Sequence, residues 1–430
     1  MNFVILPNQL FEKKYLNKIY KYIIWEHPHY FKRYKYNKKK IMLHRGSMKY
    51  YYDYLKSSNY TVKYIPFYKK MDIASYNLFD PIDKIKLPGK YIIIESPNFL
   101  LDKELYKKYR EKTKNFFFNS FYMWSKEQIN VLPKIKSQDK KNRKTFNKNI
   151  IIPQISSNKS DDKYINIGRQ YVNKHFSKNY GNTDNFIFPL THKTAKKWLK
   201  DFIKNKLEYF GSYQDAITRD SLYVFHSCLS TSINIGLLNP SYIIDEIMKN
   251  KNKMPLNSVE GFIRQLFWRE YQRYCYIYYN FDNKNYFNNK KKLSKKWYNG
   301  TTDIKPVDDA IVKAFDIGYL HHIERLMIVG NFMNLSRIHP KEGFKWFMEF
   351  SCDSYEWVMH QNVLDMVFFV SGGVTMRRPY ISSSNYILKM SDYKKEKWCD
   401  KWNEMYYIFI KKNKKKLWKF RYYFRGLKNV

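Results

Sequence analysis

The chain has 430 residues and a formal net charge of +41, from 79 lysines and arginines against 38 aspartates and glutamates. A hydrophobic content of 44% and an aromatic content of 19% supply a large core, which excludes a mostly disordered basic tail. The length predicts two or three domains. No apolar stretch reaches the ~18 residues that span a bilayer, so we expect no membrane span. The positive charge favours a polyanionic partner, with nucleic acid ahead of an anionic membrane surface.

The four cysteines, Cys228, Cys275, Cys352 and Cys399, are far apart in the sequence and form no CxxC motif. A disulfide framework is not expected in so long a chain with so few cysteines, and we expect no metal. These features predict an intracellular, reducing compartment. The N-terminus lacks the charged segment and cleavage site typical of a signal peptide.

The first 132 residues show the alternation of an α/β domain. Short apolar runs at Asn2–Leu6, Ile41–Leu43 and Tyr91–Ile94 predict strands, and Ser47–Lys56 has helical spacing between them. Strands that alternate with helices favour a parallel sheet. Residues 133–189 begin with a stretch rich in Lys, Asn, Ser and Asp, which predicts a linker or interdomain segment.

From residue 190 to residue 430 the strand pattern gives way to helices. Apolar residues recur at helical spacing in Thr194–Tyr209, Ser241–Lys249, Val259–Tyr279, Val307–Leu335 and Pro340–Glu349. Gly and Pro separate these segments, as at Gly236–Pro240 and Gly372–Gly373. We expect an all-α domain that is larger than the α/β domain.

Two segments of the helical region combine polar and apolar residues in ways that suit a ligand. In FHSCLSTSINIGLLNP, residues 225–240, hydroxyl residues precede an apolar run. A helix start of this kind suits a phosphate, although an ordinary helix cap has the same pattern. In EGFIRQLFWREY, residues 260–271, several residues recur at helical spacing: Glu260, Arg264, Gln265, Trp268 and Arg269. This spacing indicates either that they line a cavity or that they form ion pairs on the surface.

Three further segments suggest acid–base chemistry, electron transfer and anion contact. His321 and His322 stand in an apolar run and form a candidate general acid, with a core histidine or a metal site as alternatives. Asp353 lies among aromatic residues and needs a partner, for which Arg325 is a candidate; the aromatic residues are either core or electron carriers. In GGVTMRRPYISSSNY, residues 372–386, arginines alternate with tyrosines, as in nucleic-acid contacts or a solvated basic loop.

Together these segments resemble the prokaryotic branch of the photolyase–cryptochrome family, the iron–sulfur (6–4) photolyases and their relatives. Over about residues 190–410 the matching words are FGSYQDA, FHSCLSTSINIGLLNP, EGFIRQLFWREY, GYLHHIERLMIVGNF, DSYEWV and RPYISSSNYILKMSDY. Shorter words, ILPNQL, HRGSMK and DKKNR, match in the N-terminal part. The resemblance implies an α/β antenna-type domain with a parallel sheet at 1–132 and an all-α FAD-binding domain at 190–430.

The resemblance also implies roles for single residues. Contacts to the FAD phosphates would come from Ser227, Leu229, Ser230 and Thr231. The other residues of the FAD cavity would be Glu260, Gln265, Arg269 and the ion pair Arg325–Asp353 beside the isoalloxazine ring. Residues facing the lesion would be His322, His321 and Tyr380. Electron transfer would use Trp346, with Tyr298 in place of a surface-side tryptophan.

Two features depart from the family pattern. Three of the four cysteine positions that hold an iron–sulfur cluster in the family carry Pro306, Lys394 and Lys397, and Cys399 lies near the fourth. Lysine cannot replace a thiolate on such a cluster, so we expect that none is bound. Met359 stands where the family places an acid near the flavin N5 atom.

The resemblance implies light-driven repair of UV-induced pyrimidine dimers in DNA, (6–4) photoproducts first, by electron transfer from reduced FAD. The alternatives are a cyclobutane dimer photolyase, a cryptochrome-type blue-light photoreceptor without repair, and a DNA-binding scaffold with a degenerate flavin site. The expected partner is UV-damaged DNA, and the chain would act as a monomer wherever the genome resides. An antenna chromophore, unidentified from the sequence, is compatible with the N-terminal domain.

Overall fold

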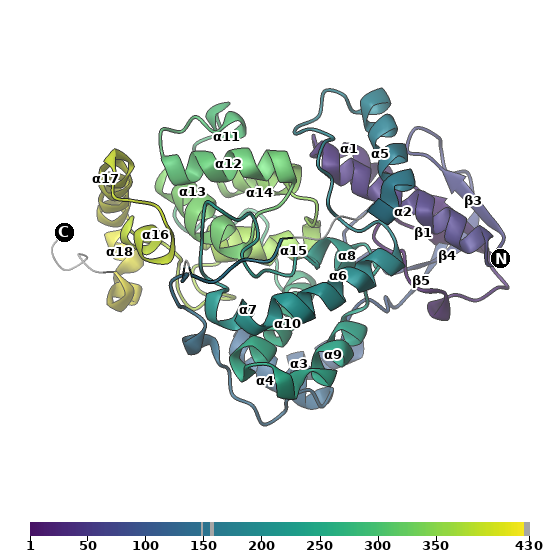
Figure 1. Cartoon of the computed structure of the whole chain (residues 1–430), viewed down its shortest axis with the longest axis horizontal. Helices are drawn as coiled ribbons and strands as arrows, with labels where there is room; N and C mark the ends of the chain where they lie inside the picture. Colours follow the sequence, from purple (N-terminus) through teal and green to yellow (C-terminus); the bar gives the residue numbers. More distant parts are fainter. Residues whose placement is uncertain (148, 155–158, 425–430) are drawn as a thin grey trace.

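The computed structural model describes residues 1–147, 149–154 and 159–424 (Figure 1). Within these residues, five strands form one sheet: β1 (Asn2–Ile5), β2 (Lys21–Trp25), β3 (Val62–Ile65), β4 (Ser75–Phe79) and β5 (Lys90–Ile94). Neighbouring strands are parallel, in the order β3-β2-β1-β4-β5. This arrangement confirms the predicted α/β class of the N-terminal part.

The predicted strands at Asn2–Leu6 and Tyr91–Ile94 are confirmed as β1 and β5, but the strand predicted at Ile41–Leu43 is wrong. That run lies in α2 (Lys38–Lys56), whose start is capped by the Asn37 side chain, which accepts a hydrogen bond from the Lys39 N–H at 2.8 Å. A three-residue apolar run has no period of its own. Here it is buried in a helix rather than in the sheet.

The helices that follow α1 (Pro28–Lys32) and α2 make up most of the remaining structure (Figure 1). They are α3 (Lys103–Lys112), α4 (Phe118–Gln128), α5 (Asp162–His175), α6 (His192–Asn205), α7 (Leu207–Tyr213), α8 (Ser230–Asn234), α9 (Pro240–Lys249), α10 (Leu256–Tyr278), α11 (Lys296–Asn299), α12 (Lys305–Ile317), α13 (Asn331–Leu335), α14 (Pro340–Phe350), α15 (Glu356–Met359), α16 (Asn385–Met390), α17 (Lys397–Lys412) and α18 (Lys414–Leu417). Of the helices described, none is long and apolar enough to cross a membrane.

Shorter and wider helical turns connect these elements. The 3₁₀ turns are η1 (Lys13–Tyr15), η2 (Asp139–Lys141), η3 (Lys159–Asp161), η4 (Lys251–Lys253) and η7 (Trp418–Tyr423), and the π-helical segments are η5 (Glu324–Gly330) and η6 (His360–Val367). The pattern predicted at Thr194–Tyr209 is divided at Lys206 between α6 and α7. The other helices predicted after residue 190 are found, except that the pattern at Val307–Leu335 is interrupted. It divides into α12, η5 and α13 because Gly318, with φ of 75°, ends α12 in the left-handed region.

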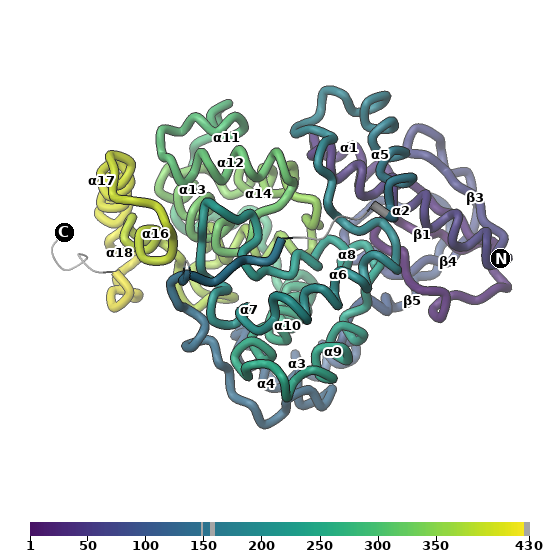
Figure 2. The backbone as a smooth tube through the Cα atoms, in the orientation of Figure 1, coloured from purple at the N-terminus to yellow at the C-terminus, as the bar shows by residue number. Residues whose placement is uncertain are grey.

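Some helices pack on a different part of the molecule from the one that their place in the sequence predicts (Figure 2). Although α3 and α4 fall within residues 1–132, they pack on α10: Tyr106 and Tyr122 donate hydrogen bonds to Glu270 and Glu260, both at 2.9 Å. Conversely, α5 falls in the predicted interdomain segment but packs on α2. A Cβ on Gly168 would lie 3.0 Å from the Met42 carbonyl oxygen, so a side chain there would push the helices apart.

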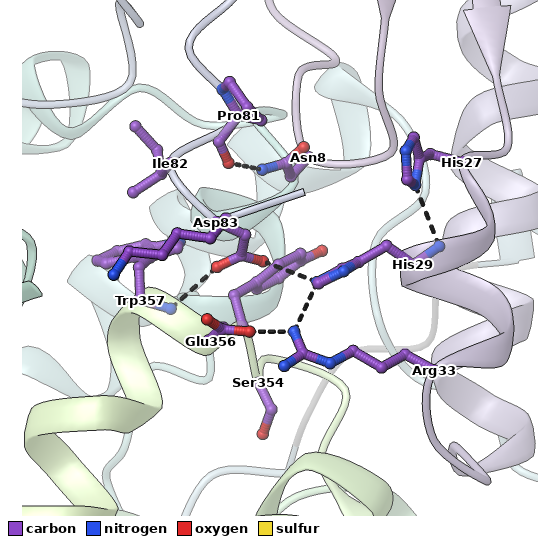
Figure 3. A network of polar contacts seen from close by, with 12 residues as sticks. Asn8, His27, His29, Arg33, Pro81, Ile82, Asp83, Ser354, Glu356 and Trp357 are labelled. Carbon is purple, nitrogen blue, oxygen red and sulfur yellow. Dashed lines mark hydrogen bonds and ion pairs between the residues drawn. The ribbon is translucent and has the colours of Figure 1, made fainter. Parts of the chain in front are cut away.

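A polar network joins the sheet-containing part to the helical part (Figure 3). Arg33, at the end of α1, forms an ion pair with Glu356 of α15. Asp83, from the loop after β4, accepts a hydrogen bond from the Trp357 N–H at 2.9 Å and lies 3.9 Å from His29 Nε2. Burial and the nearby Glu356 charge raise the pKa of Asp83 to about 8. The two parts are therefore held together by polar contacts around the buried Asp83 and Glu356 carboxyl groups as well as by apolar packing.

Candidate functional site

A cavity lies in the helical part, among α8, α10, η5 and η6. It consists of two adjoining hollows of about 240 and 420 Å³ that share lining residues, among them Ser230, Gln265, Arg325 and Asp353. The larger volume falls within the roughly 300–1,000 Å³ of ligand-binding pockets. Apolar side chains such as Phe262 and Leu326 line it beside these polar groups. The cavity is therefore suited to a partly aromatic, partly charged ligand.

Two π-helical segments shape one wall of this cavity. Arg325 and Leu326 come from η5, and Asn362 and Met366 come from η6. The segments meet at Gly330, where an added Cβ would lie 2.7 Å from Val367 Cγ1. Because π-helical turns are rare and often found at functional sites, their pairing here marks the wall as specialised.

A buried ion pair forms part of the cavity wall. Arg325 Nη1 and Nη2 donate to the two carboxylate oxygens of Asp353 at 3.0 and 3.1 Å, and Ser230 Oγ donates to Asp353 Oδ2 at 2.6 Å. Burial raises the pKa of Asp353, but the Arg325 charge and the hydroxyl hydrogen bonds outweigh it and leave the pKa below its usual value. The carboxylate is therefore charged at neutral pH. The predicted pairing of Arg325 with Asp353 is present in this geometry.

The residues expected to hold FAD divide into two groups. Those that line the cavity are Ser227, Leu229, Ser230, Gln265, Arg269, Arg325 and Asp353. Thr231 and Glu260 are buried beside it and line neither hollow. Glu260 instead accepts hydrogen bonds from Tyr122 and from the Gln138 N–H, at 2.9 and 3.0 Å, and so joins α10 to α4 and to the following segment.

The rim of the cavity carries the residues expected to face a lesion. His322 is 45% exposed, and its Nε2 lies 3.4 Å from Asp215 Oδ1. Tyr380, from the loop before α16, lines the larger hollow together with Asp215 and Arg143. Arg143 lies 3.9 Å from the second Asp215 oxygen. The rim therefore combines an accessible imidazole, a carboxylate beside it, and a phenol.

His321 occupies a different environment from its neighbour. It is 1% exposed, and its Nε2 lies 3.4 Å from Glu324 Oε2. Its ring stacks on His226 with centroids 4.6 Å apart. Burial, together with the neighbouring histidines and Lys313, lowers the pKa of His321 well below its usual value. His321 is therefore neutral near pH 7, and of the pair only His322 has access to the open cavity.

The ring nitrogens of His226, His321 and His322 lie within 4.8 Å of one another, the one such group of possible metal ligands in the described part of the chain. The His226 and His321 rings are nearly parallel, at 9°. Two parallel stacked rings cannot both direct a nitrogen lone pair at one ion unless a ring turns. The arrangement in the structure is thus not that of a formed metal site.

The two residues expected to carry electrons are connected through aromatic rings. Trp346 is fully buried and donates its indole N–H to the Trp297 carbonyl at 2.6 Å. The Phe315 ring lies 5.7 Å from both Trp346 and Tyr298, measured between centroids. Phe347, whose ring is 5.2 Å from Trp346, lines the smaller hollow. A continuous series of rings therefore leads from the cavity to Tyr298.

The structure also places the residues that depart from the family pattern. Pro306 lies at the start of α12, Lys394 and Lys397 are exposed, and Cys399 is buried in α17. Charged pairs occupy this region: Lys305 with Asp309, and Lys401 with Asp303. Met359 is 3% exposed and lines both hollows.

Several cavity residues were not identified from the sequence. Asp215, Asp139 and Arg143 lie at the rim, and His226, Asn362 and Met366 lie in the walls. Asp215 belongs to the FGSYQDA word, which was the available signal, and Arg143 belongs to DKKNR. A single carboxylate in an irregular segment has no periodic pattern from which a place in the site could be predicted.

Comparison with known proteins gives consistent matches. Residues 3–85 and 70–188 match the family model described as deoxyribodipyrimidine photo-lyase-related protein. A (6-4) photolyase of Agrobacterium fabrum is 38% identical over 261 residues, which are 57% of this chain. The matched region spans 52% of that relative, about half of its length.

Solved structures extend the similarity to nearly the whole chain. A bacterial class III photolyase from Agrobacterium tumefaciens superposes with a TM-score of 0.59 at 14% identity, covering 90% of this chain and 86% of that one. A Synechocystis cryptochrome superposes with a TM-score of 0.58 at 13% identity, covering 96% and 87%. At these identities the superpositions establish the fold.

Proposed function

We propose that this chain, a member of the photolyase–cryptochrome family, repairs UV-induced pyrimidine dimers in DNA, (6–4) photoproducts first, in a light-driven reaction with bound FAD. One observation carries the proposal: a single cavity has the buried Arg325–Asp353 pair in its wall and the accessible His322–Asp215 pair at its rim. The first pair suits a bound cofactor, and the second suits a substrate that needs a proton.

The cavity residues are compatible with FAD in their chemistry. Ser227 and Ser230 offer hydroxyl groups, and the Arg269 guanidinium offers positive charge, as a diphosphate requires. Gln265 adds an amide that can bond to a polar ring edge. When bound and reduced, FAD supplies the light-driven electron that splits the dimer.

The protein's own groups bind, orient and protect. Arg325 and Asp353 form a charged pair that Ser230 and Ser351 hold in place, so it needs no rearrangement when a ligand arrives. The apolar side chains of Phe262, Leu326 and Met359 exclude water from the same walls.

The proton required by a (6–4) lesion would come from His322. His321 is buried and neutral, whereas His322 faces the cavity and lies beside the Asp215 carboxylate. The Asp215 carboxylate lies close enough to the His322 ring, at 3.4 Å from Nε2, to orient it at the cavity. A cyclobutane dimer needs no such proton, so this pair favours the (6–4) assignment.

The DNA partner is supported by charge. The net charge of +41 attracts a phosphate backbone, and Arg143 and Arg264 line the larger hollow. A damaged, poorly stacked pair costs less to extrude from the duplex than an intact one, so the lesion would enter the cavity as an extruded dinucleotide.

A photoreceptor without repair is the second candidate. The aromatic series Phe347–Trp346–Phe315–Tyr298 favours it, because such a series can deliver electrons toward the cavity in a light response. The series has no bearing on the lesion, whereas His322 and Tyr380 have no evident use in a receptor.

The deciding experiment is light-dependent repair by the full chain. Protein loaded with FAD and reduced is mixed with a duplex that carries one (6–4) photoproduct or one cyclobutane dimer, and lesion loss is followed in light and in the dark. We expect loss of the (6–4) lesion in light only. Loss of only the cyclobutane dimer would overturn the lesion assignment. Loss of neither, with FAD bound, would favour the photoreceptor.

A further inference from the structure

The last described turn of the chain, η7, carries aromatic side chains on its surface. Trp418 is 49% exposed, Tyr422 is 83% exposed and Tyr423 is 55% exposed. Exposed aromatic rings that lie together commonly mark a binding surface. We call Trp418, Arg421, Tyr422 and Tyr423 the C-terminal platform.

The segment that carries the platform is strongly basic. Residues 405–424 contain no aspartate or glutamate. Their basic residues are Lys411, Lys412, Lys414, Lys415, Lys416, Lys419 and Arg421. A surface that combines this charge with exposed rings is complementary to a polyanion that also has flat apolar faces, which is the chemistry of a nucleic-acid strand.

Arginines hold the platform rings in place. The Arg421 guanidinium carbon lies 5.4 Å from the Trp418 ring centroid and 4.6 Å from that of Tyr422. Beneath them, the Phe420 ring packs on Phe369 at 5.3 Å, and Lys419 donates to the Gly372 carbonyl at 2.8 Å. The rings are thus presented on an anchored turn and not on a free tail.

One arginine connects the platform to the cavity rim. The Arg378 guanidinium carbon lies 4.4 Å from the Tyr423 ring centroid and 5.6 Å from that of Tyr380, which lines the larger hollow. The helices α17 and α18 that lead to the platform lie at the end of the molecule opposite the sheet (Figure 1). The platform is therefore an extension of the cavity rim and lies away from the α/β part.

We propose that the C-terminal platform binds single-stranded DNA by stacking bases on Trp418 and Tyr422. In the context of the proposed function, on which this assignment rests, the strand is the one left without partners when the lesion leaves the duplex. The alternate basic and aromatic residues match the way non-specific single-strand binders hold successive nucleotides. The platform would keep the opened duplex from closing while the lesion occupies the cavity.

The test measures binding of undamaged DNA in the dark, so it does not depend on repair. Fluorescence anisotropy gives the affinity of the full chain for a labelled oligothymidylate of about 16 nucleotides, at one fixed salt concentration. Trp418→Ala with Tyr422→Ala should weaken binding by about tenfold for each ring removed. Trp418→Phe with Tyr422→Phe keeps both rings and should stay within about twofold of the wild type.

A matched control separates the platform from exposed rings in general. Tyr68 is 57% exposed but lies in the α/β part, so Tyr68→Ala should leave the affinity unchanged. Tyr422→Ala alone is a second check, because so exposed a side chain leaves no core cavity when it is removed. Equal affinity in the wild type and the double alanine variant would overturn the proposal.

Two further results bear on the alternatives. If the double alanine variant keeps its DNA affinity but no longer binds phosphatidylserine vesicles, the platform is a membrane surface and the proposal is wrong. If oligothymidylate binding depends on the two rings while the wild type repairs neither lesion, the platform stands as a single-strand site and the proposed repair function falls.

Discussion

Two arginine–carboxylate networks with buried carboxylates in this chain have similar components and different surroundings. In the first, Arg325 and Asp353 form two hydrogen bonds, at 3.0 and 3.1 Å, in the wall of the cavity. In the second, Arg33 pairs with Glu356 between the two parts of the molecule, with Asp83 and His29 beside them (Figure 3). The second network is filled by protein groups, whereas the first borders space that a ligand can occupy.

The two networks also differ in charge. Burial raises the pKa of both Asp353 and Asp83, but Asp353 receives a bidentate guanidinium and two hydroxyl groups that bring its pKa below the usual value. Asp83 has one backbone N–H and the repelling Glu356 nearby, so its pKa is raised to about 8. Asp353, bonded directly to a guanidinium, therefore stays charged, whereas Asp83, which has no such partner at the junction between the two parts, is protonated near neutral pH.

The largest effect is expected at the cavity network. Asp353→Asn leaves the Arg325 charge buried without its partner, which should destabilise the fold by about 3–5 kcal/mol and abolish FAD binding. The readout is the visible absorption of the purified protein, together with its thermal unfolding. Ser230→Ala keeps the ion pair and serves as the milder variant, with FAD affinity reduced about tenfold. An Asp353→Asn protein that binds FAD like the wild type would contradict the role given to this pair.

The next effect concerns the proton at the rim. His322→Asn keeps the size and hydrogen bonding of the side chain but cannot donate a proton, so (6–4) repair should fall by at least about 100-fold. FAD content and DNA affinity should be unchanged, because His322 is not part of the Arg325–Asp353 pair. Near-normal repair by this variant would mean that no acid is needed and would favour a cyclobutane dimer as the substrate.

A smaller effect is expected at the carboxylate beside His322. Asp215→Asn removes the carboxylate 3.4 Å from His322 Nε2, so the imidazole is held less firmly at the cavity and (6–4) repair should slow by up to about fivefold. Asp139→Asn is the control, because Asp139 also lines the cavity but pairs with Arg143 and Arg264. Equal slowing in the Asp215→Asn and Asp139→Asn variants would contradict a specific role for Asp215 in positioning His322.

The smallest effect is expected at the junction between the two parts. The pKa of Asp83 is raised from its ordinary value of about 4 to about 8, so the group contributes stability that is fully present below about pH 4 and is lost as the pH rises through 8. Asp83→Asn cannot titrate, and its amide oxygen can still accept the Trp357 N–H. The melting temperature of the variant relative to the wild type should therefore increase between pH 6 and pH 9. A constant difference across this range would show that Asp83 does not retain its proton.

Sequence patterns predicted the helices well where the apolar period is long, as in Val259–Tyr279, found as α10 (Leu256–Tyr278). They could not place Ile41–Leu43, because a short apolar run fits a buried helix as well as a strand. Nor could they show that α3 and α4 pack on the helical part, since an apolar face indicates that a helix is covered but not by what.

For the site, too, some residues could be predicted from the sequence and others could not. Arg325 and Asp353 were paired through the resemblance, and the structure brings them together with Ser230, which lies 123 residues from Asp353 in the chain. Asp215 was missed because its role comes from its proximity to His322, which only the folded chain creates. Glu260 was expected in the cavity through the resemblance, but its carboxylate is taken up by Tyr122 and the Gln138 N–H.

We expect the network facing the cavity to serve a light-driven repair reaction and the network between the two parts to have no role in it. The direct test is the rate of light-dependent (6–4) photoproduct loss for the wild type, Asp353→Asn and Asp83→Asn under identical conditions. We expect repair by the wild type and by Asp83→Asn at similar rates, and none by Asp353→Asn or in the dark. Equal impairment of the two variants, or no repair by wild-type protein with reduced FAD bound, would contradict it.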